Sequence, residues 1–329
     1  MHVLVTGATG FVGGNLVRRL IDRGDRVAVF RRPTSSLRAL GPLADRVEHR
    51  IGRIDDAEAV RRAVAGCEVV FHVAGDVSFW GPDRPRQYAT NVIGTRNVVR
   101  ACLDAKVRRL VHTSSVAAVG VPAGRSPADE TQPFTLASRS VYYFRTKRMA
   151  EEEVAAGVAA GLDAVMANPS VILGPGWGNM HGRDLVQLIA RRQIPAYPPG
   201  GMNVVDVEDI VEGHLLALEK GRKGERYILG SENLGHGEIM RQIAEIVGVP
   251  PPRIRFPGFI SWLATWPMEA WAHFVTHRTP LMTVDYARLA GLPLYYRHDK
   301  AARELGYRPR PFKEVVERSW RWLKSEGLL

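Results

Sequence analysis

Short apolar, β-branched runs alternate with longer helical patterns through the first half of the chain. The runs that predict strands are 2–6, 26–30, 46–51, 68–74, 108–115 and 162–168. The stretches that predict helices between them are 11–23, 56–65, 85–105 and 140–160. This alternation is typical of right-handed βαβ units, which bury a parallel sheet between two layers of helices. We therefore expect residues 1–168 to form a doubly wound α/β domain.

The pattern changes after Asn168-Pro169, where loops rich in glycine and proline separate the elements. GPGWG occupies 174–178 and PAYPPGG occupies 195–201. Helices are predicted at 208–220, 236–247, 281–291 and 312–326. A strand is predicted at 203–207, and we expect segments within 203–230 to return to the main sheet. Residues 169–329 should otherwise form a smaller α/β region that binds the substrate.

Composition indicates a folded protein and argues against nucleic-acid binding. Apolar residues make up 45% and charged residues 24% of the 329 residues, which is ordinary globular usage. The formal net charge is +11, but the arginines are scattered along helical stretches and interleaved with acidic residues. Such scattered charge is typical of solvated helix faces, whereas a nucleic-acid site gathers its basic residues.

Two cysteines occur, Cys67 and Cys102, each in an apolar context and without the spacing of a metal site or a redox pair. The chain enters its first strand within a few residues of Met1, which leaves no room for a signal peptide. No apolar run reaches the roughly 18 residues that a membrane span needs. We expect a cytoplasmic protein that uses no metal and has no transmembrane segment.

A glycine-rich turn follows the first predicted strand directly. In TGATGFVG, Gly7, Gly10 and Gly13 stand between that strand and the next helix. Glycines there permit a tight turn, a close backbone approach and tight packing of the helix. The start of the helix then offers free N–H groups and a positive dipole end to a pyrophosphate. The turn predicts a Rossmann-type dinucleotide site.

The residues after the second strand favour NADP over NAD. An NAD site carries an Asp or Glu there for the ribose hydroxyls, but this chain has Arg31, Arg32 and Ser35. Arginine and serine suit a 2′-phosphate, which a carboxylate would repel. NAD remains the alternative, since both arginines also suit a solvated loop.

Tyr143 and Lys147 stand four residues apart in a predicted helix, so both side chains leave the same face. A phenol with an ordinary pKa near 10 exchanges protons poorly at neutral pH, and a nearby ammonium lowers that pKa. The pair therefore predicts an acid/base tyrosine. The neighbouring Tyr142 has Thr146 at the corresponding position and lacks this support.

These motifs together resemble the extended branch of the short-chain dehydrogenase/reductase superfamily. The glycines have its GxxGxxG spacing, TSS ends the fifth strand at 113–115, and YxxxK follows at 143–147. The similarity runs nearly end to end, through ANPSVILGPG and ELGYRPRP, and points to dihydroflavonol-reductase-like proteins and hopanoid-associated sugar epimerases. It implies that Ser115, or else Ser114, polarises the substrate carbonyl. It also implies that Lys147 holds the nicotinamide ribose and that Asn91 supports the active site.

The same resemblance implies a wider set of cofactor contacts. Ile54 packs on the adenine in this comparison, while Arg53 replaces the acid that usually precedes it, so that Asp55 or Asp56 either compensates or caps the next helix. Val73, Ala74 and Gly75 would run along the ribose. The remaining residues expected at the cofactor are Thr9, Phe11, Val12, Thr113, Pro169 and Val171.

A long apolar stretch, GFISWLATWPMEAWAHF at 258–274, favours a bulky hydrophobic substrate over a sugar nucleotide. A core segment, a dimer face and a contact with a membrane surface are the alternatives. Substrate contacts are expected from segments that should flank the nicotinamide, namely Val77, Trp80, Ser115, Ser170, Trp177 and Asn179. The resemblance also suggests a homodimer formed through 85–105 and 140–160.

The favoured function is an NADP-dependent oxidoreductase that reduces an aldehyde or ketone, or oxidises the alcohol, by hydride transfer with Tyr143 as acid/base. The alternatives are a nucleotide-sugar epimerase or dehydratase with tightly bound NAD(P), and a non-catalytic protein that senses NADP. Sensors of that kind typically lack the Tyr–Lys pair, which this chain retains.

Overall fold

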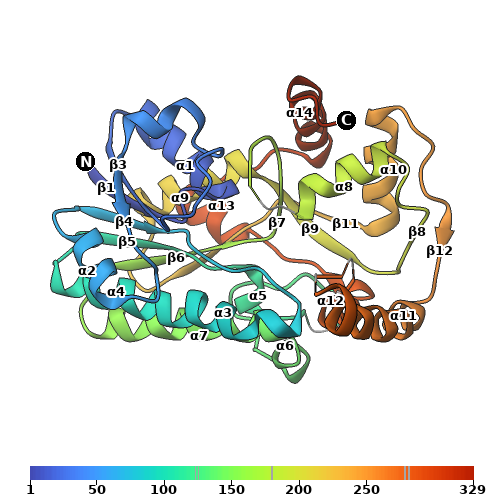
Figure 1. Ribbon diagram of the computed structural model, residues 1–329, viewed down its shortest axis with the longest axis horizontal. Helices are drawn as coiled ribbons and strands as arrows, with labels where there is room; N and C mark the ends of the chain where they lie inside the picture. The colour runs from blue at the N-terminus through green and yellow to red at the C-terminus, as the bar shows by residue number, and fades with distance from the viewer. Residues whose placement is uncertain (123, 125, 179–180, 278, 281) are drawn as a thin grey trace.

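The computed structural model describes residues 1–122, 124, 126–178, 181–277, 279–280 and 282–329. A seven-stranded parallel sheet forms its centre, in the order β3-β2-β1-β4-β5-β6-β10 (Figure 1). The strands are β1 His2–Thr6, β2 Arg26–Arg31, β3 Glu48–Ile51, β4 Val69–His72, β5 Arg109–Thr113, β6 Ala164–Pro169 and β10 Arg226–Leu229. The order reverses between β1 and β4, where a doubly wound sheet binds its ligand. The predicted doubly wound fold is confirmed.

Helices cover both faces of this sheet, as the alternating pattern predicted (Figure 1). One layer holds α1 Phe11–Asp22, α9 Val207–Lys220 and α13 Asp299–Leu305, and the other holds α2 Ala57–Val64, α4 Gly94–Asp104 and α7 Tyr142–Ala159. Each layer closes its own core cluster against the sheet, the first around Leu16 and Ile210, the second around Val60 and Val98. The helix predicted at 85–105 is α3 Arg84–Tyr88 and α4, joined by a π-helical segment, Ala89–Ile93.

A second, smaller sheet stands beside the first. In it β9 (Gly201–Asp206) pairs antiparallel with β11 (Glu232–Gly235) and parallel with β7 (Val171–Leu173) and β13 (Pro293–Leu294). The expectation that the strand at 203–207 returns to the main sheet is therefore wrong. Val204 faces the C-terminal core and Val205 the main core, so β9 lies between them, while β10 fills the edge position beside β6.

The C-terminal region packs three helices on this second sheet. They are α8 His181–Ala190, α10 His236–Val247 and α14 Phe312–Ser325, and their apolar side chains share a core with Leu173 and Val204. A two-stranded ribbon, β8 Ala196–Tyr197 with β12 Ile254–Arg255, lies at the periphery. The sequence pattern predicted α10 and α14 but missed α8 and α13, which are short or begin in glycine-rich sequence.

The remaining elements gather at the end of the molecule beyond the carboxyl edge of the main sheet (Figure 1). They are α5 Val116–Val119, α6 Leu136–Arg139, α11 Gly258–Trp271, a π-helical segment Ala272–Thr276 and α12 Val284–Ala290, with a 3-10 turn at Gly81–Asp83. Another 3-10 turn, Gly41–Arg46, lies directly before β3. Among the described residues, no helix is long and apolar enough to cross a membrane. The homodimer stays a prediction.

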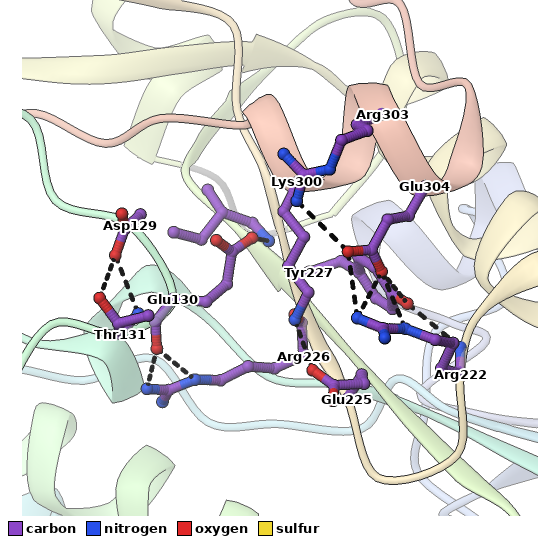
Figure 2. Close-up of polar contacts among 11 residues, drawn as sticks. Asp129, Glu130, Thr131, Arg222, Glu225, Arg226, Tyr227, Lys300, Arg303 and Glu304 are labelled. Carbon is purple, nitrogen blue, oxygen red and sulfur yellow. Dashed lines mark hydrogen bonds and ion pairs between the residues drawn. The ribbon is translucent and has the colours of Figure 1, made fainter.

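Polar contacts cover the free edge of β10 (Figure 2). The buried carboxylate of Glu130 accepts a 2.8 Å hydrogen bond from the Ile228 amide, and Arg226 donates back to the Glu130 carbonyl. Lys300 of α13 donates to the Arg226 carbonyl at 2.8 Å. These contacts satisfy an edge that would otherwise offer open pairing groups, and they fix the loop before α6 to the main sheet.

Candidate active site

The glycine turn can only be built from glycine. Gly7 has φ +69°, and a Cβ there would lie 2.6 Å from the amide nitrogen of Ala74. A Cβ at Gly13 would overlap the carbonyl oxygen of Gly7. The turn, the segment after β4 and the start of α1 are therefore pressed together, because neither Gly7 nor Gly13 carries a side chain.

The first turn of α1 is left open for an anion. Gly10 is the N-cap and provides no capping side chain, and no acidic residue occupies the first helical turn, which begins at Phe11 and Val12. Thr9 and Val12 are half-buried beside it. Uncapped N–H groups and the positive end of the helix fit a diphosphate, so the described residues fit a dinucleotide.

Arg31 is oriented at the end of β2 by a histidine. Its Nε lies 3.0 Å from Nδ1 of His49 on β3, and Nε2 of His49 lies 2.8 Å from the carbonyl oxygen of Ala44. The imidazole can satisfy both contacts only by accepting from Arg31 at Nδ1 and donating to Ala44 at Nε2. Arg32 is exposed and Ser35 half-buried nearby. The structure thus presents basic groups where the sequence predicted a 2′-phosphate site.

The adenine segment after β3 has a local explanation for its unusual arginine. Arg53 forms a bidentate pair with Asp55, at 3.0 and 2.7 Å, and remains largely exposed. Asp56 caps α2 by accepting from the Glu58 and Ala59 amides. Ile54 packs against Gly94 of α4. Of the two aspartates, Asp56 is therefore the helix cap, and Asp55 neutralises Arg53.

The segment that follows β4 is held from both sides. Thr6 Oγ1 accepts a 3.2 Å hydrogen bond from the Ala74 amide, which places Val73 and Ala74 beside the glycine turn. Asn91, in the π-helical segment, accepts from the Asp76 amide at 2.8 Å and donates to Thr146 at 3.1 Å. Asn91 therefore ties the backbone next to the exposed Gly75 to the helix that carries Tyr143, which fits its expected supporting role.

Tyr143 lies buried at the start of α7, with Ser115 as a hydrogen-bonding partner. Burial raises the pKa of Tyr143 to about 12, and the hydrogen bond with Ser115 opposes this shift. This rise in pKa is opposite to the lowering expected from the Lys147 ammonium, because the loss of water around the phenol outweighs the other influences on it. Ser115 caps α5 by accepting from the Ala117 amide at 3.1 Å. The Tyr143 phenol is therefore protonated at neutral pH.

Lys147 lies one turn further along α7 and is also buried. Its Nζ donates a 2.8 Å hydrogen bond to the main-chain carbonyl of Thr113, at the end of β5. Burial lowers the pKa of Lys147 to about 8, and the carboxylate of Glu151 opposes that shift. The side chain of Thr113 is engaged elsewhere, since its Oγ1 lies 2.7 Å from Nε2 of His214.

A buried carboxylate organises the residues behind the site and decides between the two serines. Glu151 accepts hydrogen bonds from Ser114 and from Asn168, each at 2.6 Å, and pairs with Arg226 at 3.2 Å. Asn168 also donates to the Ser115 carbonyl at 2.9 Å. The Ser114 hydroxyl is therefore occupied away from Tyr143, which leaves Ser115 as the serine at the phenol. Sequence reasoning missed Glu151, although it stands four residues after Lys147.

Apolar side chains surround Tyr143. The ring of Phe79 packs edge-to-face on Tyr143 with centroids 5.4 Å apart, and Tyr286 of α12 packs on Phe79 at 5.7 Å. The other side chains of this cluster include Ala117, Val121, Phe134, Leu289, Leu292 and Leu294. The sequence predicted Val77 and Trp80 here, and these flank Phe79 in the same segment, with Val77 exposed and Trp80 half-buried. Phe79 and Tyr286 were missed.

Trp177 packs between two distant segments of the chain. The Arg38 guanidinium carbon lies 3.3 Å from the centroid of the Trp177 ring. The same ring packs on Trp322 of α14 with centroids 5.1 Å apart. The adjacent Gly178 backbone is pressed on Phe11 at the start of α1. These contacts place Trp177 near the start of α1, and its assignment to the substrate stays a prediction. Asn179 lies outside the described residues.

The segment between β6 and β7 completes the site. Pro169 ends β6 and Val171 begins β7, so Ser170 stands at the point where the chain passes from the first sheet to the second. The Ser170 hydroxyl is buried and has no protein partner. A buried polar atom without a partner is costly, so a bound molecule that pairs with it would remove a penalty.

With this geometry in place, comparison with known proteins identifies the class. Residues 3–230 match the model of the NAD dependent epimerase/dehydratase family, and the chain belongs to that family, in the extended short-chain dehydrogenase/reductase group. Members of the family bind NAD(P), and the relatives of this chain include oxidoreductases and reductases.

Individual relatives cover almost the whole chain. A putative dihydroflavonol 4-reductase of Synechocystis is 34% identical over 98% of this chain and 94% of the relative. Sterol demethylase protein B of Methylococcus capsulatus is 35% identical over the full length of both chains. The crystal structure of gox2253 superposes with a TM-score of 0.85 at 35% identity, covering 99% of each chain.

Proposed function

We propose that this protein is an NADP-dependent oxidoreductase that reduces the carbonyl group of an apolar substrate, with Tyr143 as the proton donor. The observation that carries this proposal is the phenol itself. Tyr143 is buried, hydrogen-bonded to Ser115 and one helical turn from the Lys147 ammonium, and its pKa of about 12 keeps it protonated at neutral pH. A protonated phenol suits the donation of a proton to a carbonyl oxygen.

Each residue of the site has its own role in this proposed reaction. Bound in this site, NADPH supplies the hydride that the carbonyl carbon accepts. Tyr143 donates the proton that the substrate oxygen takes up, and the Ser115 hydroxyl orients that oxygen. Lys147 stabilises the negative charge that develops on the phenol oxygen as the proton leaves. Asn91 keeps the neighbouring backbone in register with α7 through its contacts with Asp76 and Thr146.

The apolar wall supports the choice of substrate class. Phe79 and Leu289 belong to the apolar cluster around Tyr143, and Tyr286 packs on Phe79, so a sugar diphosphate would gain little from these side chains. The relatives named for a sterol and for a dihydroflavonol are consistent with a bulky cyclic substrate. Arg31, held by His49, supports NADP as the preferred cofactor.

A panel of soluble aldehydes, cyclic ketones and steroid ketones, assayed with NADPH and with NADH, tests this proposal. We expect net oxidation of NADPH by at least one apolar carbonyl compound, and weaker turnover with NADH. Purified protein that carries a tightly held nicotinamide and interconverts nucleotide sugars without net redox change would establish an epimerase instead. Binding of NADPH without turnover of any compound in the panel would favour a sensor.

A further inference from the structure

The helix α11 and the π-helical segment that continues it carry an exposed apolar face. It consists of Ile260, Leu263, Trp271 and Phe274, which are 43, 55, 63 and 76% exposed, with Trp266 on its flank. Their spacings of three, eight and three residues place the four side chains on one side of a helix. Stretches of the surface that gather large apolar side chains in this way mark interaction sites.

Polar side chains of this helix take part in its contact with the protein. The side turned toward the protein carries Thr265 and Glu269, and the Glu269 carboxylate accepts a 3.1 Å hydrogen bond from the Val284 amide at the start of α12. Glu269 is the single charged residue between positions 258 and 276. An ordinary surface helix buries its apolar side and exposes its polar one. Here large apolar side chains among the described residues face outward, so they are available to a partner.

Charge indicates what that partner is. Arg253 and Arg255 are exposed immediately before α11, on either side of Ile254, which is 62% exposed. The chain as a whole has a net charge of +11, so two copies repel each other, whereas an anionic surface attracts each of them. Tryptophan is enriched where an apolar phase meets water, and basic residues beside it bind anionic lipid headgroups. These features fit the surface of an anionic bilayer.

The apolar face is also connected to Tyr143. Helix α11 packs on α12, and the two lie side by side at the carboxyl end of the main sheet (Figure 1). Tyr286 of α12 contacts Phe79, and Phe79 contacts Tyr143. A series of aromatic side chains therefore runs from Tyr286 of α12, the helix that packs on α11, through Phe79 to the phenol.

We propose that the apolar face of α11 docks on an anionic lipid surface, so that an apolar substrate passes from the bilayer to Tyr143 along α12. The insertion is shallow, since α11 lies along the surface and its protein-facing side stays bonded to α12. The docking proposal depends only on the exposed apolar face of α11 and on the charge of the protein. The delivery of substrate rests on the proposed function.

Sedimentation with vesicles tests the docking. The full-length protein is mixed with vesicles of phosphatidylcholine, or of phosphatidylcholine and phosphatidylglycerol in equal parts. We expect binding to the anionic vesicles, a shift of tryptophan emission to shorter wavelength, and weaker binding in high salt. The double variant Trp271→Ser/Phe274→Ser should bind at least roughly tenfold more weakly. Leu329→Ser, which also removes an exposed apolar side chain, should bind normally.

The controls separate docking from folding and from catalysis. The double variant should keep its melting temperature and its turnover of a water-soluble ketone, and lose rate only with a substrate dissolved in vesicles. Unchanged vesicle binding by the double variant overturns the proposal, as does a wild-type protein that does not bind. A dimer that the same substitutions dissolve would assign the face to a second copy. Vesicle binding without any ketone reduction would leave docking intact and refute the proposed function.

Discussion

The Nζ atom of Lys147 donates a 2.8 Å hydrogen bond to the main-chain carbonyl oxygen of Thr113. This bond ties the middle of α7 to the end of β5, so the helix that carries the phenol and the strand that leads to Ser115 move as one unit. Because Lys147 is buried there, its pKa is lowered to about 8, and the charge next to Tyr143 depends on pH within an accessible range.

Reduction should slow as pH rises through about 8. Below that pH the Lys147 ammonium is charged and stabilises the phenolate that forms when Tyr143 gives up its proton, whereas above it the charge is lost although Tyr143 remains protonated. This loss of rate should appear as an alkaline limb in the profile of kcat/KM against pH. In Lys147→Arg, whose guanidinium keeps its charge, the limb should disappear from that range. The same limb in both proteins would show that another group titrates.

Replacing Glu151 by Gln should move this alkaline limb to lower pH, by roughly one unit. The carboxylate opposes the lowering of the Lys147 pKa, so its removal leaves desolvation unopposed. The measurement is the pH profile of kcat/KM for a variant whose circular dichroism is native. Glu152→Gln, an exposed change on the same helix, should leave the profile unchanged. A limb that stays in place in Glu151→Gln would remove Glu151 from this role.

Arg31→Gln should cost roughly tenfold or more in kcat/KM for NADPH and change the value for NADH little. The guanidinium that His49 orients is then no longer available to a 2′-phosphate. Steady-state kinetics with each cofactor provides the ratio, and Arg46→Gln, an exposed change in the neighbouring turn, is the matched control. Equal losses with both cofactors would contradict the assignment of NADP.

Gly178→Ala should weaken binding of the dinucleotide. The residue has φ +142°, and a Cβ would lie 2.6 Å from the Phe11 amide nitrogen, at the helix start that we assign to the diphosphate. Calorimetric titration with NADPH measures the change in Kd. Gly81→Ala, where a Cβ meets no atom within 4 Å, should bind normally. A normal affinity of Gly178→Ala for NADPH would mean that the loop containing Gly178 does not contribute to cofactor binding.

The features that could be predicted from the sequence are those whose signal is local. Gly7, Gly10 and Gly13 stand three residues apart in one turn and the helix start that follows it, and Tyr143 and Lys147 lie four apart on one helix, so their relationship is fixed by backbone geometry. The alternation of strands and helices likewise predicted the main sheet, since each βαβ unit forms from neighbouring segments.

The features that were missed depend on contacts between distant segments. Tyr286 contacts Phe79 only because α12 packs beside the catalytic region. Trp177 contacts both Arg38 and Trp322 although the three residues come from three separate parts of the chain. The period of a strand does not reveal which sheet it joins, which is why β9 was misplaced. Burial had a similar effect on Tyr143, since the sequence suggested a lowered pKa and the packed structure raises it.

The most direct test of the account compares Tyr143→Phe with Tyr142→Phe in the reduction of the best carbonyl substrate by NADPH. Both changes remove one hydroxyl from the first turn of α7, but Tyr142 lies outside the Ser115 and Lys147 arrangement and stacks with Arg84 and Arg145 instead. We predict that Tyr143→Phe lowers kcat by roughly a hundredfold or more while NADPH binding is retained, and that Tyr142→Phe keeps nearly full activity. Full turnover by folded Tyr143→Phe would contradict the central claim.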